Sequence, residues 1–229
     1  FVDDGSTDDT PLVIERLRQQ HSQRVSTLRL GANVGKAEAV RRGMLLAMRR
    51  KATFVGYWDA DLATPLDAIP RLRSVLEERP ELLLVMGSRV ALLGRQIQRR
   101  WRRHLLGRVF ATTASFVLGL PVYDTQCGAK LFRVTAETAE VFHRPFDTRW
   151  IFDVEILARL VQSRDAAGAI YEYPLERWQE VNGSRLRTAD FLAAAFDLAT
   201  IYRRSRGGKA AAQSGIQHPV SNIQHRDAA

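Results

Sequence analysis

The most constraining stretch of the sequence is residues 54–65, where an apolar, aromatic-rich run ends abruptly in two carboxylates. Residues 54–58 are short, bulky and bounded by breakers, so they predict a buried β-strand. Asp59 and Asp61 then fall at the carboxyl end of a strand, where open α/β sheets collect ligands. Two such carboxylates can share a hard divalent cation, with substrate phosphates completing its shell. The alternative for an isolated Asp-x-Asp is an acidic loop that caps the next helix.

The charge of the chain indicates an anionic partner. Its 229 residues include 34 Lys and Arg against 25 Asp and Glu, a net charge of +9 at pH 7. That excess favours nucleic acid, a phosphorylated substrate or an anionic membrane surface. Cys127 is the single cysteine, which excludes an intramolecular disulfide and a cysteine zinc site. No apolar run is long enough to span a bilayer, so we expect one soluble or peripheral domain.

Strands and helices alternate along the first 90 residues. This order predicts an α/β fold with a mostly parallel central sheet, flanked by helices and joined by right-handed crossovers. The strands are expected at the N-terminus and at residues 25–30, 54–58 and 82–87, and the helices near residue 10 and at 36–50 and 67–78. Later residues predict helices at 137–142, 150–162 and 188–203 and a strand at 169–175. Residues 207–229 are small, polar and aperiodic, which predicts a disordered tail.

Residues 94–118 predict one long basic helix or a broken pair of helices. Apolar residues recur every four positions and would form one stripe: Ile97, Trp101, Leu105 and Val109. Arginines share that spacing at Arg95, Arg99 and Arg103. A basic amphipathic helix of this kind suits a membrane interface or a polyanion. The alternative is a solvated face on an ordinary packed helix.

Four features occur in a telling order: the Asp-Asp-Gly-Ser turn at 3–6, the Gly-x-x-x-Gly-Lys turn at 31–36, Asp-Ala-Asp at 59–61 and the arginine-rich helix. Together they resemble the inverting nucleotide-sugar glycosyltransferases of family 2, which have the GT-A fold. Three further motifs resemble the dolichyl-phosphate glucosyltransferase branch, a neighbour of the dolichyl-phosphate mannose synthases. They are residues 124–132 (DTQCGAKLF), 149–155 (RWIFDVE) and 183–186 (GSRL). The likeness covers roughly residues 1–205.

The resemblance implies a donor-nucleotide site. Asp4, with Asp3 beside it, matches the carboxylate that contacts the base, and Lys36 would sit near the nucleotide. Asp59 would approach the ribose and the metal, and Asp59 and Asp61 would hold Mg²⁺ or Mn²⁺. Arg185 falls where a basic residue closes over the pyrophosphate, although this branch usually has Lys there. Turn and cap chemistry is the alternative for Asp3 and Asp4, and a solvated side chain is the alternative for Lys36.

The resemblance also implies the acceptor and the reaction. Sugar, most simply glucose from UDP-glucose, would pass with inversion to a polyprenyl or dolichyl phosphate. Arg99 and Arg103 match the positions that meet the lipid phosphate. Because the lipid tail stays in the bilayer, we expect a peripheral protein on the cytoplasmic face of a membrane. A lipid phosphate is largely ionised near pH 7, since its second pKa is roughly 6, so it needs positioning more than deprotonation.

Two acids complete the predicted catalytic set. Asp61 would act through the metal, which neutralises the leaving pyrophosphate as a Lewis acid. Asp124 is the best-placed candidate for a general base, and anchoring of its own loop is the alternative. Asp153 and Glu155, one residue apart on a helix, are expected to point in different directions. At least one of them is expected to be an ordinary charge at the start of the helix.

The family begins with a strand and helix that are absent here, so we expect residues 1–206 to be an N-terminally truncated catalytic domain. A family 2 transferase using mannose or a glycan acceptor is the nearest alternative. A basic nucleic-acid-binding domain is the alternative from another class, and its binding would be strongly salt-dependent. Acidic strand ends would repel a polyanion and no nucleic-acid motif is present, so we expect no nucleic-acid partner.

Overall fold

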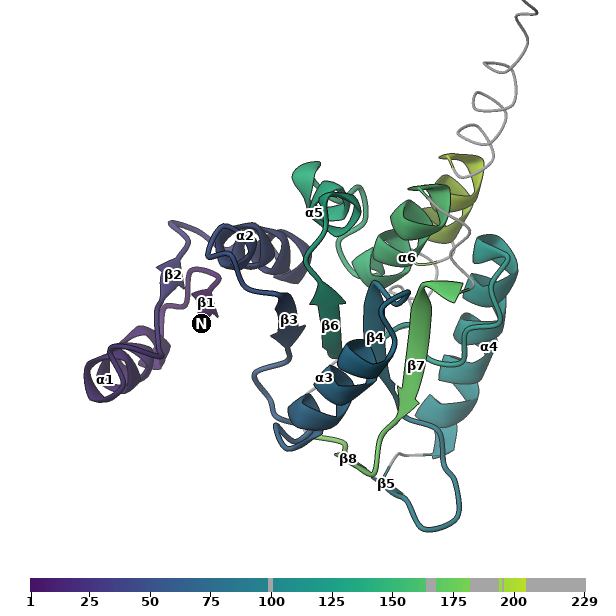
Figure 1. The fold of residues 1–229 in the computed structure, drawn as a ribbon, viewed down its shortest axis with the longest axis horizontal. Coiled ribbons are helices and arrows are strands. Elements are labelled where there is room, and N and C mark those ends of the chain that lie inside the picture. Colours follow the sequence, from purple (N-terminus) through teal and green to yellow (C-terminus); the bar gives the residue numbers. More distant parts are fainter. Residues whose placement is uncertain (99–100, 164–167, 182–193, 195, 205–229) are drawn as a thin grey trace, which may run out of the picture.

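The computed structural model describes residues 1–98, 101–163, 168–181, 194 and 196–204 (Figure 1). At one end of the molecule, β1 (Val2–Asp3) pairs in parallel with β2 (Leu28–Arg29), and α1 (Thr10–Gln20) connects them. The expected strand at 25–30 is therefore only two residues long. The next helix, α2 (Lys36–Met48), packs against both β1 and β3 (Phe54–Trp58) and joins this end to the rest of the fold.

The central sheet has the strand order β3-β6-β4-β7. Its other strands are β4 (Leu84–Ser88), β6 (Ala129–Arg133) and β7 (Ile170–Pro174). β6 is antiparallel to both β3 and β4, whereas β4 and β7 are parallel. Three of these four strands thus share one direction, as expected of a mostly parallel sheet, but β6 separates β3 from β4. Because β6 runs the other way, its first residue lies beside the last residue of β3.

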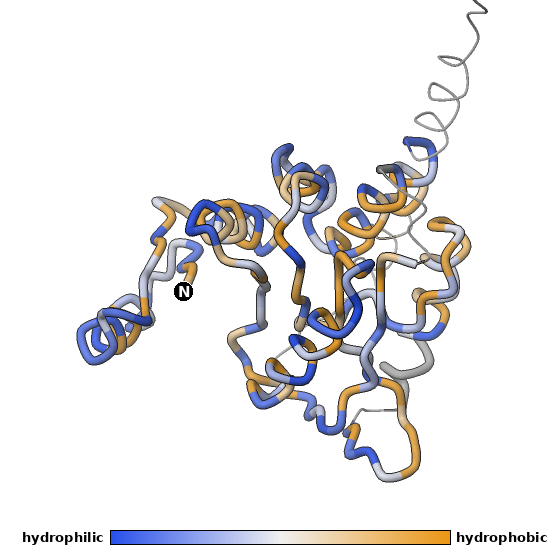
Figure 2. The backbone as a smooth tube through the Cα atoms, in the orientation of Figure 1, coloured by the Kyte–Doolittle hydropathy of each residue, from blue (hydrophilic) through white to orange (hydrophobic). Residues whose placement is uncertain are grey.

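Alternate residues of the strands face two separate hydrophobic cores. Leu84 and Met86 face a core that also contains Met44 and Phe152, whereas Val85 faces a second core with Leu72. The second core lies under α3 (Ala68–Glu78). The first is covered by α2, α4 (Trp101–Leu118), α5 (Ala136–His143) and α6 (Phe152–Ser163). Figure 2 shows the hydrophobic residues concentrated in these layers, while α1, which buries no residue, is largely hydrophilic.

The prediction of a helix over 94–118 is wrong in its first part. Residues Gln96–Gln98 form β5, which pairs in parallel with β8 (Arg177–Gln179), and α4 begins only at Trp101. Ile97 packs against the second core beside Trp178, and Arg95 lies 3.3 Å from Glu176. The expected apolar stripe is therefore split between a strand and a helix, and its last member, Val109, is 62% exposed. Pairing with a segment some 80 residues later is a long-range event that four-residue spacing cannot reveal.

The predicted bounds of α5, α6 and β7 agree with the structure to within two residues. Residues 196–204 are helical and overlap the helix expected at 188–203, of which residues 188–193 and 195 lie outside the described residues. The tail at 207–229 also lies outside them, so the domain boundary stays a prediction. Within the described part of the chain, no helix combines the length and the apolar character needed to cross a bilayer.

Candidate active site

The turn after β1 is built around Asp4. Its Oδ1 accepts a hydrogen bond from the backbone N of Val34 at 2.8 Å, and its Oδ2 accepts one from that of Gly35 at 2.9 Å. Gly5 has φ +72° and a Cβ there would lie 2.6 Å from the carbonyl carbon of Ala32, so the two turns pack backbone to backbone. Asp4 thereby holds the 31–35 turn against the end of β1. The turn chemistry foreseen as an alternative for this residue is present.

Asp3 lies one residue earlier and is 5% exposed. Its Oδ1 accepts a hydrogen bond from the backbone N of Ser6 at 2.9 Å, and its Oδ2 faces Arg29 Nε at 3.4 Å. The hydrogen bonds from Ser6 lower the pKa of Asp3, and the Arg29 charge lowers it further. Asp3 is therefore an ionised, buried group that shapes the turn.

Asp59 and Lys36 meet at the end of β3. The Lys36 Nζ lies 2.7 Å from Asp59 Oδ1 and 2.8 Å from Oδ2, and both side chains are partly exposed. The backbone N of Asp59 donates to the Gly128 carbonyl at 2.8 Å. A Cβ on Gly128 would lie 2.0 Å from Asp59 Oδ2, so only glycine leaves room for this carboxylate. Gly128 was not foreseen as a site residue; the signal is a glycine directly before β6.

Asp61 lies in the tight turn after Asp59. Its Oδ1 accepts a hydrogen bond from the backbone N of Ala63 at 3.0 Å, and Leu62 between them has φ +54°. Among the described residues no group of three or more His, Cys, Asp or Glu side chains could hold a metal ion. The pair Asp59 and Asp61 nevertheless fits a hard cation such as Mg²⁺ or Mn²⁺. Such ions commonly take one or two carboxylates and complete their shell with water and substrate phosphates.

Asp124 is tied to Arg89 at the end of β4. The Arg89 Nε lies 2.6 Å from Asp124 Oδ2 and its Nη2 2.7 Å from Oδ1, and the backbone N of Arg89 also donates to Oδ2. Burial alone would lower the pKa of Arg89, but the charge and hydrogen bonds of Asp124 raise it overall. Glu172 of β7 accepts hydrogen bonds from the backbone N of Asp124 and of its neighbour Tyr123. This geometry favours the anchoring role of Asp124 over that of a general base.

A buried ion pair supports the loop between Asp124 and Gly128. Lys130, which is fully buried, lies 2.5 Å from Asp153 Oδ1. The same ammonium group donates to the carbonyls of Thr125 at 3.0 Å and Cys127 at 2.8 Å. Tyr57 also donates to Asp153, and burial followed by the Asp153 charge raises the Tyr57 pKa. Lys130 was not identified as a site residue from the sequence, and the sequence feature that points to it is a lysine inside the apolar strand β6.

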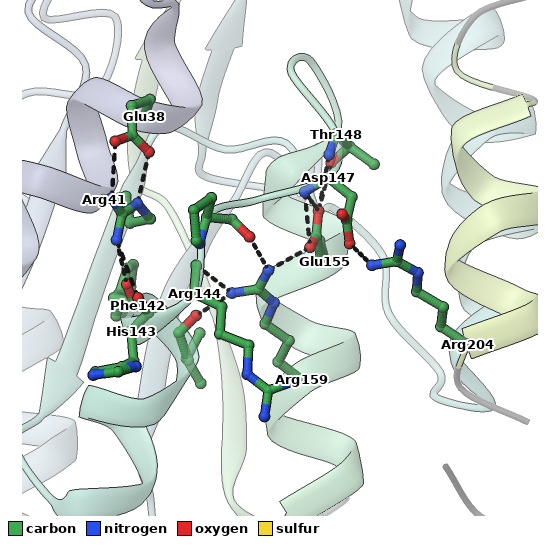
Figure 3. A network of polar contacts seen from close by, with 12 residues as sticks. Glu38, Arg41, Phe142, His143, Arg144, Asp147, Thr148, Glu155, Arg159 and Arg204 are labelled. Atoms are coloured by element: carbon green, nitrogen blue, oxygen red, sulfur yellow. Dashed lines mark hydrogen bonds and ion pairs between the residues drawn. The ribbon is translucent and has the colours of Figure 1, made fainter. Parts of the chain in front are cut away.

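Glu155 points away from this loop, as expected of two acids one residue apart on a helix. It accepts hydrogen bonds from the backbone N of Asp147 and Thr148 and lies 2.7 Å from Arg159 (Figure 3). A pocket of about 910 Å³ nearby is lined by α5, α6 and residues 200–204. The pocket is lined in part by Ala136, which follows the last residue of β6, whereas Gly128 precedes the first residue of β6. Glu155 and this pocket thus belong to the edge of the sheet opposite the aspartates.

The structure brings Asp4, Lys36, Asp59 and Asp61 to one edge of the sheet, with the Asp124 loop beside them. Arg99 and Arg185 lie outside the described residues. Arg103 lies in α4, but its side chain is also outside them. The acceptor-phosphate assignment therefore stays a prediction, as does closure by Arg185.

Comparison with known proteins decides the family. Residues 1–138 match Glycosyl transferase family 2. The chain belongs to this family. The family 2 chain is 35% identical over 194 residues to a dolichyl-phosphate beta-glucosyltransferase of Dictyostelium discoideum, covering 81% of the chain and 56% of that relative. It is 32% identical over 219 residues to the dolichyl-phosphate beta-glucosyltransferase of Saccharomyces cerevisiae, covering 88% and 63%. It thus spans about three fifths of the length of these relatives.

A solved structure confirms the fold of the family 2 chain. Glucosyl-3-phosphoglycerate synthase from Mycobacterium tuberculosis, in complex with phosphoglyceric acid, superposes with a TM-score of 0.54 at 23% identity. The superposition covers 89% of this chain and 67% of that one. The predicted GT-A architecture is therefore confirmed.

Proposed function

We propose that this chain is the catalytic part of an inverting glucosyltransferase that moves glucose from UDP-glucose to a polyprenyl or dolichyl phosphate. The observation that carries the proposal is the meeting of Lys36 and Asp59 at the end of β3, with Asp61 in the next turn and the Asp4-held turn beside them. The names of the dolichyl-phosphate beta-glucosyltransferase relatives supply the sugar and the lipid.

On the donor side, Asp59 and Asp61 would hold Mg²⁺ or Mn²⁺. When bound, the cation supplies Lewis-acid neutralisation of the leaving diphosphate. Lys36 is placed to donate to a phosphate oxygen, because its ammonium group already reaches the Asp59 carboxylate at 2.7 Å. Asp3 and Asp4 would form the wall on the side of the base, and Arg185 would close over the diphosphate.

On the acceptor side, Arg99 and Arg103 would position the lipid phosphate for attack on the face of the sugar opposite the diphosphate. The phosphate is the nucleophile and is largely ionised near pH 7, with a second pKa of roughly 6. A general base is then unnecessary, which agrees with an Asp124 carboxylate engaged by the Arg89 guanidinium at 2.6 and 2.7 Å. We therefore assign Asp124 to positioning the loop that contains Gly128.

The membrane contact would involve α4. Val109 is 62% and Phe116 79% exposed, and their i, i+7 spacing places both on one face of the helix. Aromatic and apolar side chains beside arginines suit the interface of an anionic membrane. We infer peripheral attachment through this face, on the cytoplasmic side, with residues 1–206 as the catalytic domain.

The test is transfer of radiolabelled glucose from UDP-glucose to dolichyl phosphate with Mn²⁺, counted in the organic phase. The proposal expects an organic-extractable product that disappears with Asp61→Ala, and a higher acceptor KM with unchanged donor KM in Arg103→Ala. A product confined to the aqueous phase would contradict the lipid acceptor. Transfer from GDP-mannose but not UDP-glucose would contradict the glucosyl donor.

A further inference from the structure

Arg149 reaches the donor side of the site from a distant part of the chain. It lies just before α6, and its guanidinium group packs on the turn that precedes α2. A Cβ on Gly35 would lie 3.4 Å from Arg149 Nη2 and 3.6 Å from its Nε, and Gly35 has φ +94°. The contact joins segments more than 100 residues apart, and Gly35 directly precedes Lys36 in the chain.

Arg149 differs from several other basic residues of the fold in its ion pairing. Other arginines of the fold have carboxylate partners: Arg41 pairs with Glu38, Arg89 with Asp124 and Arg159 with Glu155. Lys36 pairs with Asp59. Arg149 is exposed, and within the described ranges no carboxylate forms an ion pair with it. A guanidinium without a carboxylate partner among the described residues thus lies against Gly35, the residue before Lys36, and Lys36 in turn contacts the Asp59 carboxylate.

We propose that Arg149 binds the diphosphate of the nucleotide-sugar donor. The inference rests on the proposed function for the identity of the donor. A guanidinium presents parallel N–H donors that match phosphate oxygens and stays charged at all working pH values. Lys36 shares its charge with Asp59, so Arg149 contributes the positive charge that the leaving diphosphate needs as the glycosidic bond breaks.

The contact at Gly35 assigns Arg149 to the donor rather than the acceptor. Gly35 belongs to the turn held by Asp4 and directly precedes Lys36, both of which lie on the donor side. Arg103, one of the two arginines proposed for the lipid phosphate, lies in α4 instead. Arg149 thereby connects the start of α6 to the donor turn.

The experiment compares binding of UDP and of uridine to Arg149→Gln, with Mn²⁺ present. UDP affinity is measured by calorimetry and uridine affinity by NMR titration on the full 229-residue chain. Loss of one charge-assisted contact predicts roughly a tenfold weaker UDP affinity, while uridine, which lacks phosphate, binds with unchanged affinity. Arg149→Lys, which keeps the charge but not the planar fork, is expected to lose less. Arg144→Gln is the matched control, because Arg144 is 81% exposed and lies at the opposite edge of the sheet.

Each outcome bears on the inference. Unchanged UDP affinity in Arg149→Gln overturns it, and so does an equal loss for uridine, which would indicate a purely structural role. If Arg149→Gln does not fold, Arg149→Lys decides by the same two ligands. A wild-type chain that binds no UDP refutes both the inference and the proposed donor. A chain that binds UDP through Arg149 but makes no lipid-linked product refutes only the proposed acceptor reaction.

Discussion

Gly128→Ala is the substitution whose effect follows most directly from the geometry. The φ of Gly128 is not positive, so alanine fits its backbone, and the new methyl group alone causes the effect. That methyl would lie 2.0 Å from Asp59 Oδ2 and 2.1 Å from its Cγ. Because the backbone N of Asp59 is bonded to the Gly128 carbonyl at 2.8 Å, the two segments cannot simply separate. The Asp59 carboxylate must rotate away from Lys36.

The cost to stability is modest and the cost to function is large. A side chain held about 30° off its rotamer costs about 0.5–1.5 kcal/mol. Loss of a partly exposed ion pair adds about 0–1 kcal/mol. A total of about 0.5–2.5 kcal/mol lowers the melting temperature by about 1–10 °C for a domain of this size. A displacement on the order of 1 Å of a group that positions the reactants lowers the rate about 100-fold.

The assay pairs thermal melting with glucose transfer from UDP-glucose. Gly168→Ala is the matched control, because a Cβ there meets nothing within 4 Å and the residue is exposed. We expect Gly168→Ala to keep both wild-type values and Gly128→Ala to melt slightly lower with a much reduced kcat/KM. Wild-type activity in Gly128→Ala would refute the reasoning that the position of Asp59 controls the site.

Two further predictions concern the charges that hold the fold. Lys130→Met leaves the Asp153 carboxylate buried without its partner, so it should lower the free energy of unfolding by about 3–5 kcal/mol, against at most about 1 kcal/mol for the exposed pair in Lys36→Met. Urea unfolding of both variants measures this, and equal losses would contradict the role of the buried pair. Arg41 donates hydrogen bonds to Glu38 (Figure 3), and these lower the pKa of Glu38 from 4.5 to about 2. Burial works against this shift, and the hydrogen bond from Arg42 adds to it. Its ionised form therefore stabilises the folded chain above about pH 4.5, and this contribution is lost as the pH falls towards about 2. The difference in unfolding free energy between wild type and Glu38→Gln should shrink over that range, and a constant difference would contradict the pairing.

Sequence patterns within short windows predicted the elements that depend on local sequence. The strand at 54–58, the acids at its end and the helix that begins at Lys36 each follow from apolar runs, breakers and turn residues within a short window. The family was identified because several such motifs occur in a definite order. The rule that ligands collect at the carboxyl ends of strands applied to Asp59 and Asp61, whereas the place of Lys36 near the nucleotide was implied by the resemblance.

Contacts between distant segments could not be predicted in the same way. Insertion of β6 between β3 and β4 brings Gly128 to Asp59, about 70 residues earlier, and pairing of β5 with β8 removes Ile97 from the predicted helix. The Arg89 partner of Asp124 lies 35 residues away, and this contact favours anchoring of the loop over general-base catalysis for Asp124. Lys130 can be buried because Asp153 and two loop carbonyls surround its ammonium group, and these partners are known only from the structure.

The most direct test of the central claim is to count Mn²⁺ bound in the presence of UDP by electron paramagnetic resonance. We expect one saturable site in the wild-type chain, with Mn²⁺ affinity lowered at least about tenfold in Asp59→Asn and Asp61→Asn, since each substitution removes a charged ligand of a hard cation. Asp67→Asn is the control, because Asp67 is exposed on the same loop and pairs with Arg177. Mn²⁺ affinity in Asp59→Asn and Asp61→Asn equal to that of the wild type would contradict the account.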